Sequence, residues 1–252
     1  MTQPLHFAKR GPSRYLRYSE LSRQPLYMLV FLLPLIIFYE IALYSSSNNI
    51  QIKAHDHLVR FFEQIDMPPT QGLWLGGIAI IATLFIWHIF VENKWTIKLK
   101  VIAFMAVESV AFAIPLLLFG AVLGGYVATA TPSPIDTLVI FEKVAVSIGA
   151  GLYEELLFRM ILIAGIHTIV CNVFKKSNLA GLGIGVVVSA VLFALYHDLP
   201  NAGSLSAIVI FFFFTAGIYL GFLYVIRGFG IAAATHAAYD VVATTLLVSL
   251  SQ

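Results

Sequence analysis

Residues 151–160 read Gly-Leu-Tyr-Glu-Glu-Leu-Leu-Phe-Arg-Met and place three ionisable side chains, Glu154, Glu155 and Arg159, in an apolar setting. A charge in such surroundings is costly unless it is paired, faces a wet cavity or takes part in chemistry. On a helix Glu155 and Arg159 share one face, whereas Glu154 points about 100° away. The spacing therefore predicts a Glu155–Arg159 ion pair and leaves Glu154 available for another role. This stretch alone is equally consistent with an ion-pair network that only joins helices.

The composition of the whole chain is that of a membrane protein. Of its 252 residues, 60% are hydrophobic and 11% charged, and the mean hydropathy is +0.90, which is far too apolar for a soluble domain of this length. The net charge of +2 comes without a basic stripe, so no nucleic-acid partner is indicated. The single cysteine, Cys171, excludes an internal disulfide and a cysteine-based metal cluster. We therefore expect an all-α, polytopic helical bundle surrounded by a lipid bilayer.

Apolar runs separated by polar loops predict about seven to eight transmembrane helices. They cover residues 26–44, 72–91, 101–127, 137–174, 179–196, 204–226 and 231–250. Basic residues gather in the segment 1–25 and after the second, fourth and sixth runs, which predicts that these parts are cytoplasmic and that segments 45–71 and 128–136 lie on the opposite side. We divide the chain into a cytoplasmic N-terminal segment 1–25, N-terminal transmembrane helices 26–135 and a catalytic transmembrane core 136–252.

The fourth run, residues 137–174, is too long for one straight crossing. A serine and two glycines at residues 147–151 predict an interruption from which the helix restarts. Glu154 would then fall in the first turn of the restarted helix, where the helix dipole favours a carboxylate. Two acidic residues lie in other runs: we expect Glu40 at the membrane interface and Glu108 against a neighbouring helix.

Histidines from two other runs form a constellation with Glu154. His197 follows the fifth run, and His236 lies in the last run with Asp240 one helical turn further on, where a carboxylate can fix the tautomer of an imidazole. A carboxylate and two imidazoles in a water-poor cavity can activate water and stabilise an oxyanion, or they can bind a divalent metal. The residue types alone leave both chemistries open.

These ordered motifs resemble the CAAX-protease and bacteriocin-processing (CPBP, Abi) family of intramembrane endopeptidases. The motifs are Glu-Glu-x-x-x-Arg from Glu154, Phe-x-x-x-His ending at His197, and His-x-x-x-Asp from His236 to Asp240. The resemblance implies a helical membrane fold and proteolysis by a glutamate-activated water. It assigns Glu154 and His197 to water activation, and His236 and Asp240 to the oxyanion side.

The resemblance also assigns Glu155 and Arg159 to the framework of the first motif, and two features depart from the family pattern. Only residues 241–252 follow Asp240, so we expect no further spanning helix like that ending the prenyl-protein proteases, which weighs against a CAAX substrate. Asp240 stands where an amide donor is often found, and an ionised carboxylate would repel an oxyanion. We therefore expect Asp240 to accept a hydrogen bond from one ring nitrogen of His236, while the other N–H points at the scissile carbonyl.

Three functions follow from this reading. The first is an intramembrane protease of the glutamic type that needs no cofactor or metal and cleaves a membrane-anchored protein or peptide in the bacterial inner (cytoplasmic) membrane. The second is a metalloprotease with zinc on His197, His236 and a glutamate, although the compact His-Glu-x-x-His helix is absent. The third is a non-catalytic membrane protein, such as a proton-coupled carrier, a scaffold or an immunity protein, in which the same residues form a relay.

Overall fold

The computed structural model describes residues 17–45, 69–127, 138–197 and 203–247, and within them it contains helices and no strand. The all-α prediction is therefore confirmed for this part of the chain. The elements are α1 (Tyr18–Leu21), α2 (Pro25–Ser45), α4 (Pro69–Val91), α5 (Leu99–Val127), α6 (Ile140–Glu155), the π-helical segment η2 (Leu156–Ile163), α7 (Ala164–Asn172), α8 (Asn178–Tyr196), α9 (Gly203–Arg227), α10 (Phe229–Val242) and the π-helical segment η3 (Ala243–Leu247).

Each of the seven predicted apolar runs coincides with a helical element. By length and composition, four helices of the described part can cross a bilayer: Pro25–Ser45, Leu99–Leu123, Asn178–Tyr196 and Ala207–Arg227. A shorter apolar helix covers Gly76–Val91. The larger number of crossings and the sidedness of the loops remain predictions, and most of the two loops expected on the outer side lies outside the described residues.

The predicted interruption at residues 147–151 is wrong. The backbone continues from α6 through η2 into α7 as one rod from residue 140 to residue 172, and the irregular part is η2, after the glutamates. Gly151 serves close packing, because a Cβ atom there would lie 2.6 Å from the backbone nitrogen of Ala237 and 2.7 Å from the carbonyl oxygen of Ala233, both on α10. A glycine is therefore required at this position, because only a residue without a side chain lets α6 and α10 approach so closely.

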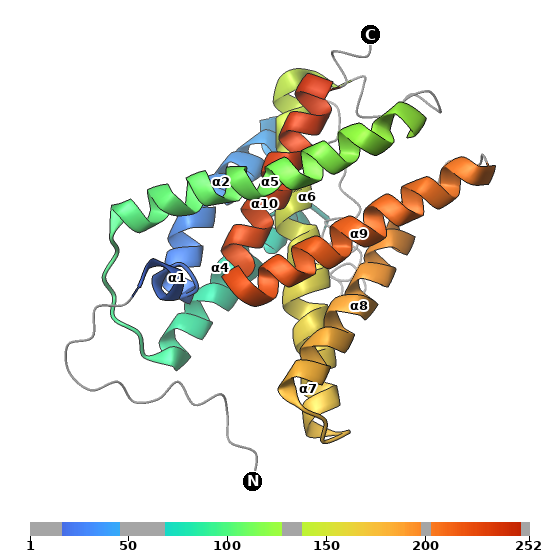
Figure 1. Ribbon diagram of the computed structural model, residues 1–252. Coiled ribbons are helices and arrows are strands. Elements are labelled where there is room, and N and C mark those ends of the chain that lie inside the picture. Colours follow the sequence, from blue (N-terminus) through green and yellow to red (C-terminus); the bar gives the residue numbers. More distant parts are fainter. Residues whose placement is uncertain (1–16, 46–68, 128–137, 198–202, 248–252) are drawn as a thin grey trace.

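Helix α10 lies in the middle of the bundle beside α6, and it also packs on α5, α9 and α2 (Figure 1). Its first turns are almost completely buried, with Phe229, Ile231, Ala232 and Ala233 each at most 1% exposed. The main hydrophobic core joins these residues to α2, α4 and α6. The helix that carries His236 is thus held on several sides, which is the condition for a precisely placed side chain.

Helices α8 and α9 pack through small residues. A Cβ atom on Gly217 would lie 2.9 Å from the Cα atom of Ala190, and one on Gly221 would lie 3.1 Å from Val186.

Two of the acidic residues named above are also enclosed by helices. Glu108 pairs with Arg227 through nitrogen–oxygen distances of 2.6 and 2.7 Å, as expected, whereas Glu40, expected at the membrane interface, is only 8% exposed and lies among helices.

Candidate active site

Glu154 lies near the end of α6 with its carboxylate in the protein interior. Its side chain is 9% exposed, and its Oε2 atom has no hydrogen-bond partner among the described residues. The nearest basic group is the Nε2 atom of His197, 3.8 Å away. A separation above 3.5 Å is too long for a direct hydrogen bond, but a water molecule can bridge it.

His197 is the residue that ends α8, and two contacts fix its ring. The Nδ1 atom lies 2.8 Å from the carbonyl oxygen of Phe193, one turn earlier on α8. A carbonyl oxygen only accepts hydrogen bonds, so Nδ1 carries a proton and Nε2 is the atom directed toward Glu154. The ring also stacks on Phe213 of α9, with centroids 3.7 Å apart and planes inclined by 19°.

Glu155 connects the first motif to the third. Its Oε1 atom accepts a hydrogen bond from Nδ1 of His236 at 2.8 Å and lies 2.9 Å from the guanidinium of Arg159. The Glu155 and Arg159 side chains are completely buried. The predicted Glu155–Arg159 ion pair is confirmed, but Glu155 also fixes the second histidine, which the spacing along one helix did not reveal.

Arg159 lies in η2 and reaches across the bundle. Its guanidinium carbon is 4.3 Å from the centre of the Phe193 ring, and one terminal nitrogen is 3.5 Å from the carbonyl oxygen of Gly217. A cation over an aromatic face is attracted by the ring quadrupole. Arg159 therefore joins the helix that carries Glu154 to α8 and α9, which carry other parts of the site.

The contact between His236 and Asp240 differs from the sequence prediction. Oδ2 of Asp240 is 3.4 Å from Nε2 of His236, a looser contact than the one with Glu155. The other ring nitrogen of His236, Nδ1, is thus bound by Glu155 and does not face the cavity. Because both carboxylates are acceptors, both contacts are favourable only when the ring carries two N–H groups.

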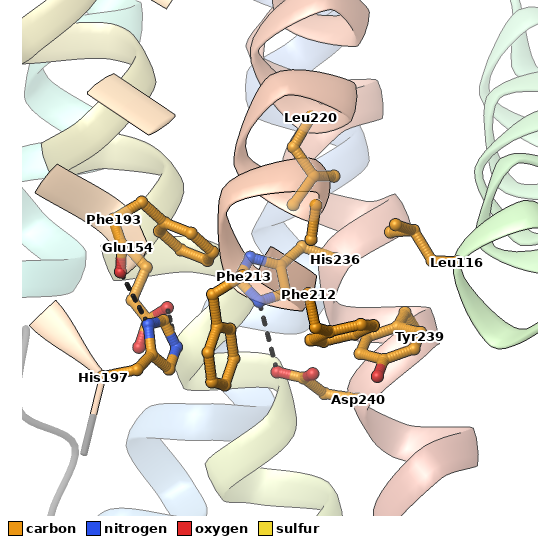
Figure 2. Close-up of a pocket in the computed structure, with 11 residues that line it drawn as sticks. Leu116, Glu154, Phe193, His197, Phe212, Phe213, Leu220, His236, Tyr239 and Asp240 are labelled. Carbon is orange, nitrogen blue, oxygen red and sulfur yellow. Dashed lines mark hydrogen bonds and ion pairs between the residues drawn. The ribbon is translucent and has the colours of Figure 1, made fainter. Parts of the chain in front are cut away.

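One cavity of about 60 Å³ is lined by Glu154, His197, His236 and Asp240. Figure 2 shows Glu154 and His197 facing each other on one side of it, with His236 and Asp240 on the other. The remaining wall is apolar or aromatic and comes mainly from α5, α9 and α10. Its residues are Leu116, Phe193, Phe212, Phe213, Ala216, Leu220 and Tyr239. The volume is enough for about two water molecules, so a peptide requires movement of this wall.

The donor set does not resemble a preformed metal centre. Within the described part of the chain, no group of three or more His, Cys, Asp or Glu side chains converges on one point as metal ligands would. His236 uses Nδ1 to bind Glu155, which takes that nitrogen out of a zinc ligand set. The prediction that no metal is needed stays a prediction.

The three motifs fall within one segment that matches a known family. Residues 136–242 match the family model described as Rce1-like, type II CAAX prenyl endopeptidase Rce1-like. Over this segment the chain is similar to the CAAX-protease family. The resemblance inferred from the motifs is confirmed, and the matched family is one of proteases.

The match covers the part of the chain that contains α6 to α10, less than half of its length. Helices α2, α4 and α5 lie outside it. No curated protein and no solved structure matches the chain. The N-terminal helices contact the matched segment mainly through the packing of α2 on α6 and of α5 on α10.

Proposed function

We propose that this protein is an intramembrane endopeptidase of the glutamic type, which cleaves a membrane-proximal, C-terminal peptide bond of a membrane-anchored substrate. The observation that carries the proposal is the placement of Glu154. Its Oε2 atom, which no hydrogen-bond partner occupies in the described part of the chain, lies 3.8 Å from Nε2 of His197, at a cavity large enough for water. A carboxylate and an imidazole at this separation can hold one water molecule between them.

The reaction is a hydrolysis in which Glu154 acts as general base. Glu154 accepts a proton from the water while Nε2 of His197 helps to orient it, and the water oxygen attacks the scissile carbonyl carbon. The tetrahedral intermediate then breaks the carbon–nitrogen bond, and the proton held by Glu154 passes to the leaving nitrogen. The products are a carboxylic acid and an amine, so no cofactor is needed to balance the step.

His236 supplies the oxyanion donor in this proposal. Glu155 holds Nδ1, so the N–H on Nε2 is the donor that faces the cavity. Asp240 lies 3.4 Å from Nε2, a distance at which a carbonyl oxygen can compete for the same N–H. A fixed donor aimed at developing negative charge stabilises the transition state more than the ground state. Asp240 then acts by holding the ring between turnovers and not by contacting the oxyanion.

The apolar surroundings of the cavity support the proposal that the substrate reaches it from within the lipid bilayer. Apart from its four ionisable residues, the cavity wall consists of apolar and aromatic residues, including Phe212 and Leu116. The outer surfaces of α5 and α9 expose large apolar side chains such as Val122 and Phe211. A substrate anchored in the bilayer can approach along such surfaces without leaving lipid. The bacterial inner membrane is part of this proposal, and fractionation of the source cells tests it.

The test uses purified protein in lipid vesicles and a synthetic substrate in which an apolar anchor helix precedes a short polar tail. Mass spectrometry should show two fragments whose masses sum to that of the substrate plus one water. His197→Ala should reduce turnover by about 10²-fold or more, because the water loses its second holder. His167→Ala, a histidine on α7 that does not line the cavity, is the matched control and should cleave normally. Intact substrate with the native protein across a panel of tail sequences would contradict the proposal.

A further inference from the structure

Tyr153 immediately precedes Glu154 on α6 and forms a buried hydrogen bond with the N-terminal helices. Its hydroxyl donates to Oε1 of Glu40 on α2 at 2.9 Å, and the Tyr153 side chain is completely buried. The ring of Tyr39, also completely buried, packs edge-on against the Tyr153 ring, with centroids 5.3 Å apart. A carboxylate placed among membrane helices is costly and marks a functional position by default.

Two adjacent glycines of α4 make room for this pair. A Cβ atom on Gly77 would lie 2.5 Å from Oε1 of Glu40, and one on Gly76 would overlap the ring of Tyr153. Any other residue at either position would push the carboxylate or the ring aside. Helix α4 therefore closes the site of the Glu40–Tyr153 pair against α2 and excludes lipid from it.

Three successive residues of α6 contact three different helices. Tyr153 binds Glu40 on α2, Glu154 faces His197 at the end of α8, and Glu155 binds His236 on α10. Successive residues of an α-helix are rotated by about 100°, so these contacts are spread around the whole circumference of α6. Contacts in three such directions determine the rotation of a helix about its own axis.

We propose that the Tyr153–Glu40 hydrogen bond is a positioning device that sets the rotation of α6 and so aims the Glu154 carboxylate at its water. Side chains extend about 5–6 Å from a helix axis, so a rotation of about 20° moves a carboxylate by about 2 Å. A misplacement of about 1 Å can reduce a rate by about 10²-fold. Tyr153 lies inside the family match and Glu40 outside it, so this contact gives the N-terminal helix α2 a role in the chemistry. This inference rests on the proposed role of Glu154.

The kinetic test compares kcat and KM of purified variants in vesicles. Tyr153→Phe removes only the hydroxyl and should lower kcat by about tenfold or more with KM within about twofold, because Glu154 is misaimed while substrate contacts persist. Glu40→Gln keeps an acceptor oxygen and should retain most activity, whereas Glu40→Leu should resemble Tyr153→Phe. The double variant Glu40→Leu/Tyr153→Phe should be no worse than either single variant, since both break one contact.

A matched control separates positioning from loss of a buried hydroxyl. Tyr27 on α2 is 1% exposed, and its hydroxyl accepts a hydrogen bond from the backbone nitrogen of Lys98 at 3.2 Å. Tyr27→Phe removes an equally buried hydroxyl away from α6 and should keep kcat within about twofold of the native value. An equal fall of kcat in Tyr27→Phe and Tyr153→Phe would overturn the inference, as would an unchanged kcat in Tyr153→Phe.

A second readout does not depend on activity. In a Cys171→Ser background, the thiols introduced by Glu154→Cys and His197→Cys are joined with a short bifunctional thiol reagent, with and without Tyr153→Phe. The crosslinked fraction should fall severalfold with Tyr153→Phe and stay constant with Tyr27→Phe, and a constant fraction in both would overturn the inference. If Glu154→Gln cleaves normally while the crosslink still responds, the proposed function fails and the rotational role of Tyr153 stands.

Discussion

Gly151→Ala is the substitution that most sharply tests how closely α6 and α10 pack. The added Cβ atom would lie 2.6 Å from the backbone nitrogen of Ala237, whereas ordinary contact begins at 3.4 Å. The atoms in its way are two backbone atoms and the Cβ atom of Ala237, none of which can be moved by a side-chain rotation. The two helices must separate locally by about 0.8 Å, the difference between these distances.

This separation acts on the site one turn away. Glu155 and His236 lie on the same two helices, and their hydrogen bond measures 2.8 Å. If the full shift reaches them, the distance becomes about 3.6 Å, at which it is no longer a hydrogen bond. Overpacking typically costs about 1–3 kcal/mol, and alanine regains about 0.5–1 kcal/mol in helix propensity. We therefore expect the free energy of unfolding to fall by about 1–2 kcal/mol and kcat to be lower.

The assay is thermal unfolding in detergent together with turnover in vesicles. For a chain of this size about 1 kcal/mol corresponds to about 2–4 °C, so the midpoint should fall by several degrees. Gly165→Ala and Gly183→Ala are the controls, because a Cβ atom at either position has nothing within 4 Å. Both controls should unfold at or slightly above the native midpoint. If Gly151→Ala behaves like the controls in midpoint and turnover, the close-packing argument is wrong.

Three other predictions concern the site. Arg159→Ala should lower the free energy of unfolding by about 3–5 kcal/mol, seen as a loss of folded yield, because Glu155 becomes a buried charge without its cation; a normal yield contradicts this. Asp240→Asn and Asp240→Leu should each keep partial turnover and lose less than His236→Ala, because Glu155 still holds the ring; a loss in Asp240→Leu equal to that in His236→Ala would contradict this, and a double-mutant cycle with independent effects would refute a joint role. Chelators should leave turnover unchanged. The metalloprotease would be supported instead if elemental analysis found one zinc per chain, if chelation removed both the zinc and the activity, and if added zinc restored the activity.

The positions of the helices were predictable, and the depth of Glu154 could have been predicted better. Helix α7 ends at Asn172 and α8 begins at Asn178, so the two form an antiparallel hairpin. Glu154 lies 18 residues before the first of these positions and His197 19 residues after the second. At about 1.5 Å per residue, both lie about 27–28 Å from the turn. The α7–α8 hairpin alone therefore places Glu154 and His197 at the same height along the bundle, and no interruption of the helix is needed.

Other parts of the site depend on contacts that no local pattern contains. The spacing of Glu155 and Arg159 predicts their ion pair, but the second partner of Glu155 is a histidine 81 residues away on another helix. The π-helical segment η2 also has no Pro or Gly that would signal it. The partner of Glu40 was not predicted, because Tyr153 and the two glycines that enclose the carboxylate come from different helices. Such contacts are set by tertiary packing, which periodicity along one chain does not encode.

The measurement that tests the central claim most directly is the turnover of Glu154→Gln, a nearly isosteric change that removes the base and keeps the shape of the site. It should be made per folded molecule, with the melting midpoint as the check on folding and substrate binding measured separately. We expect native-like folding and binding, and a turnover reduced by about 10²–10⁴-fold, the usual contribution of a general base. Turnover within about tenfold of the native enzyme would contradict water activation by Glu154.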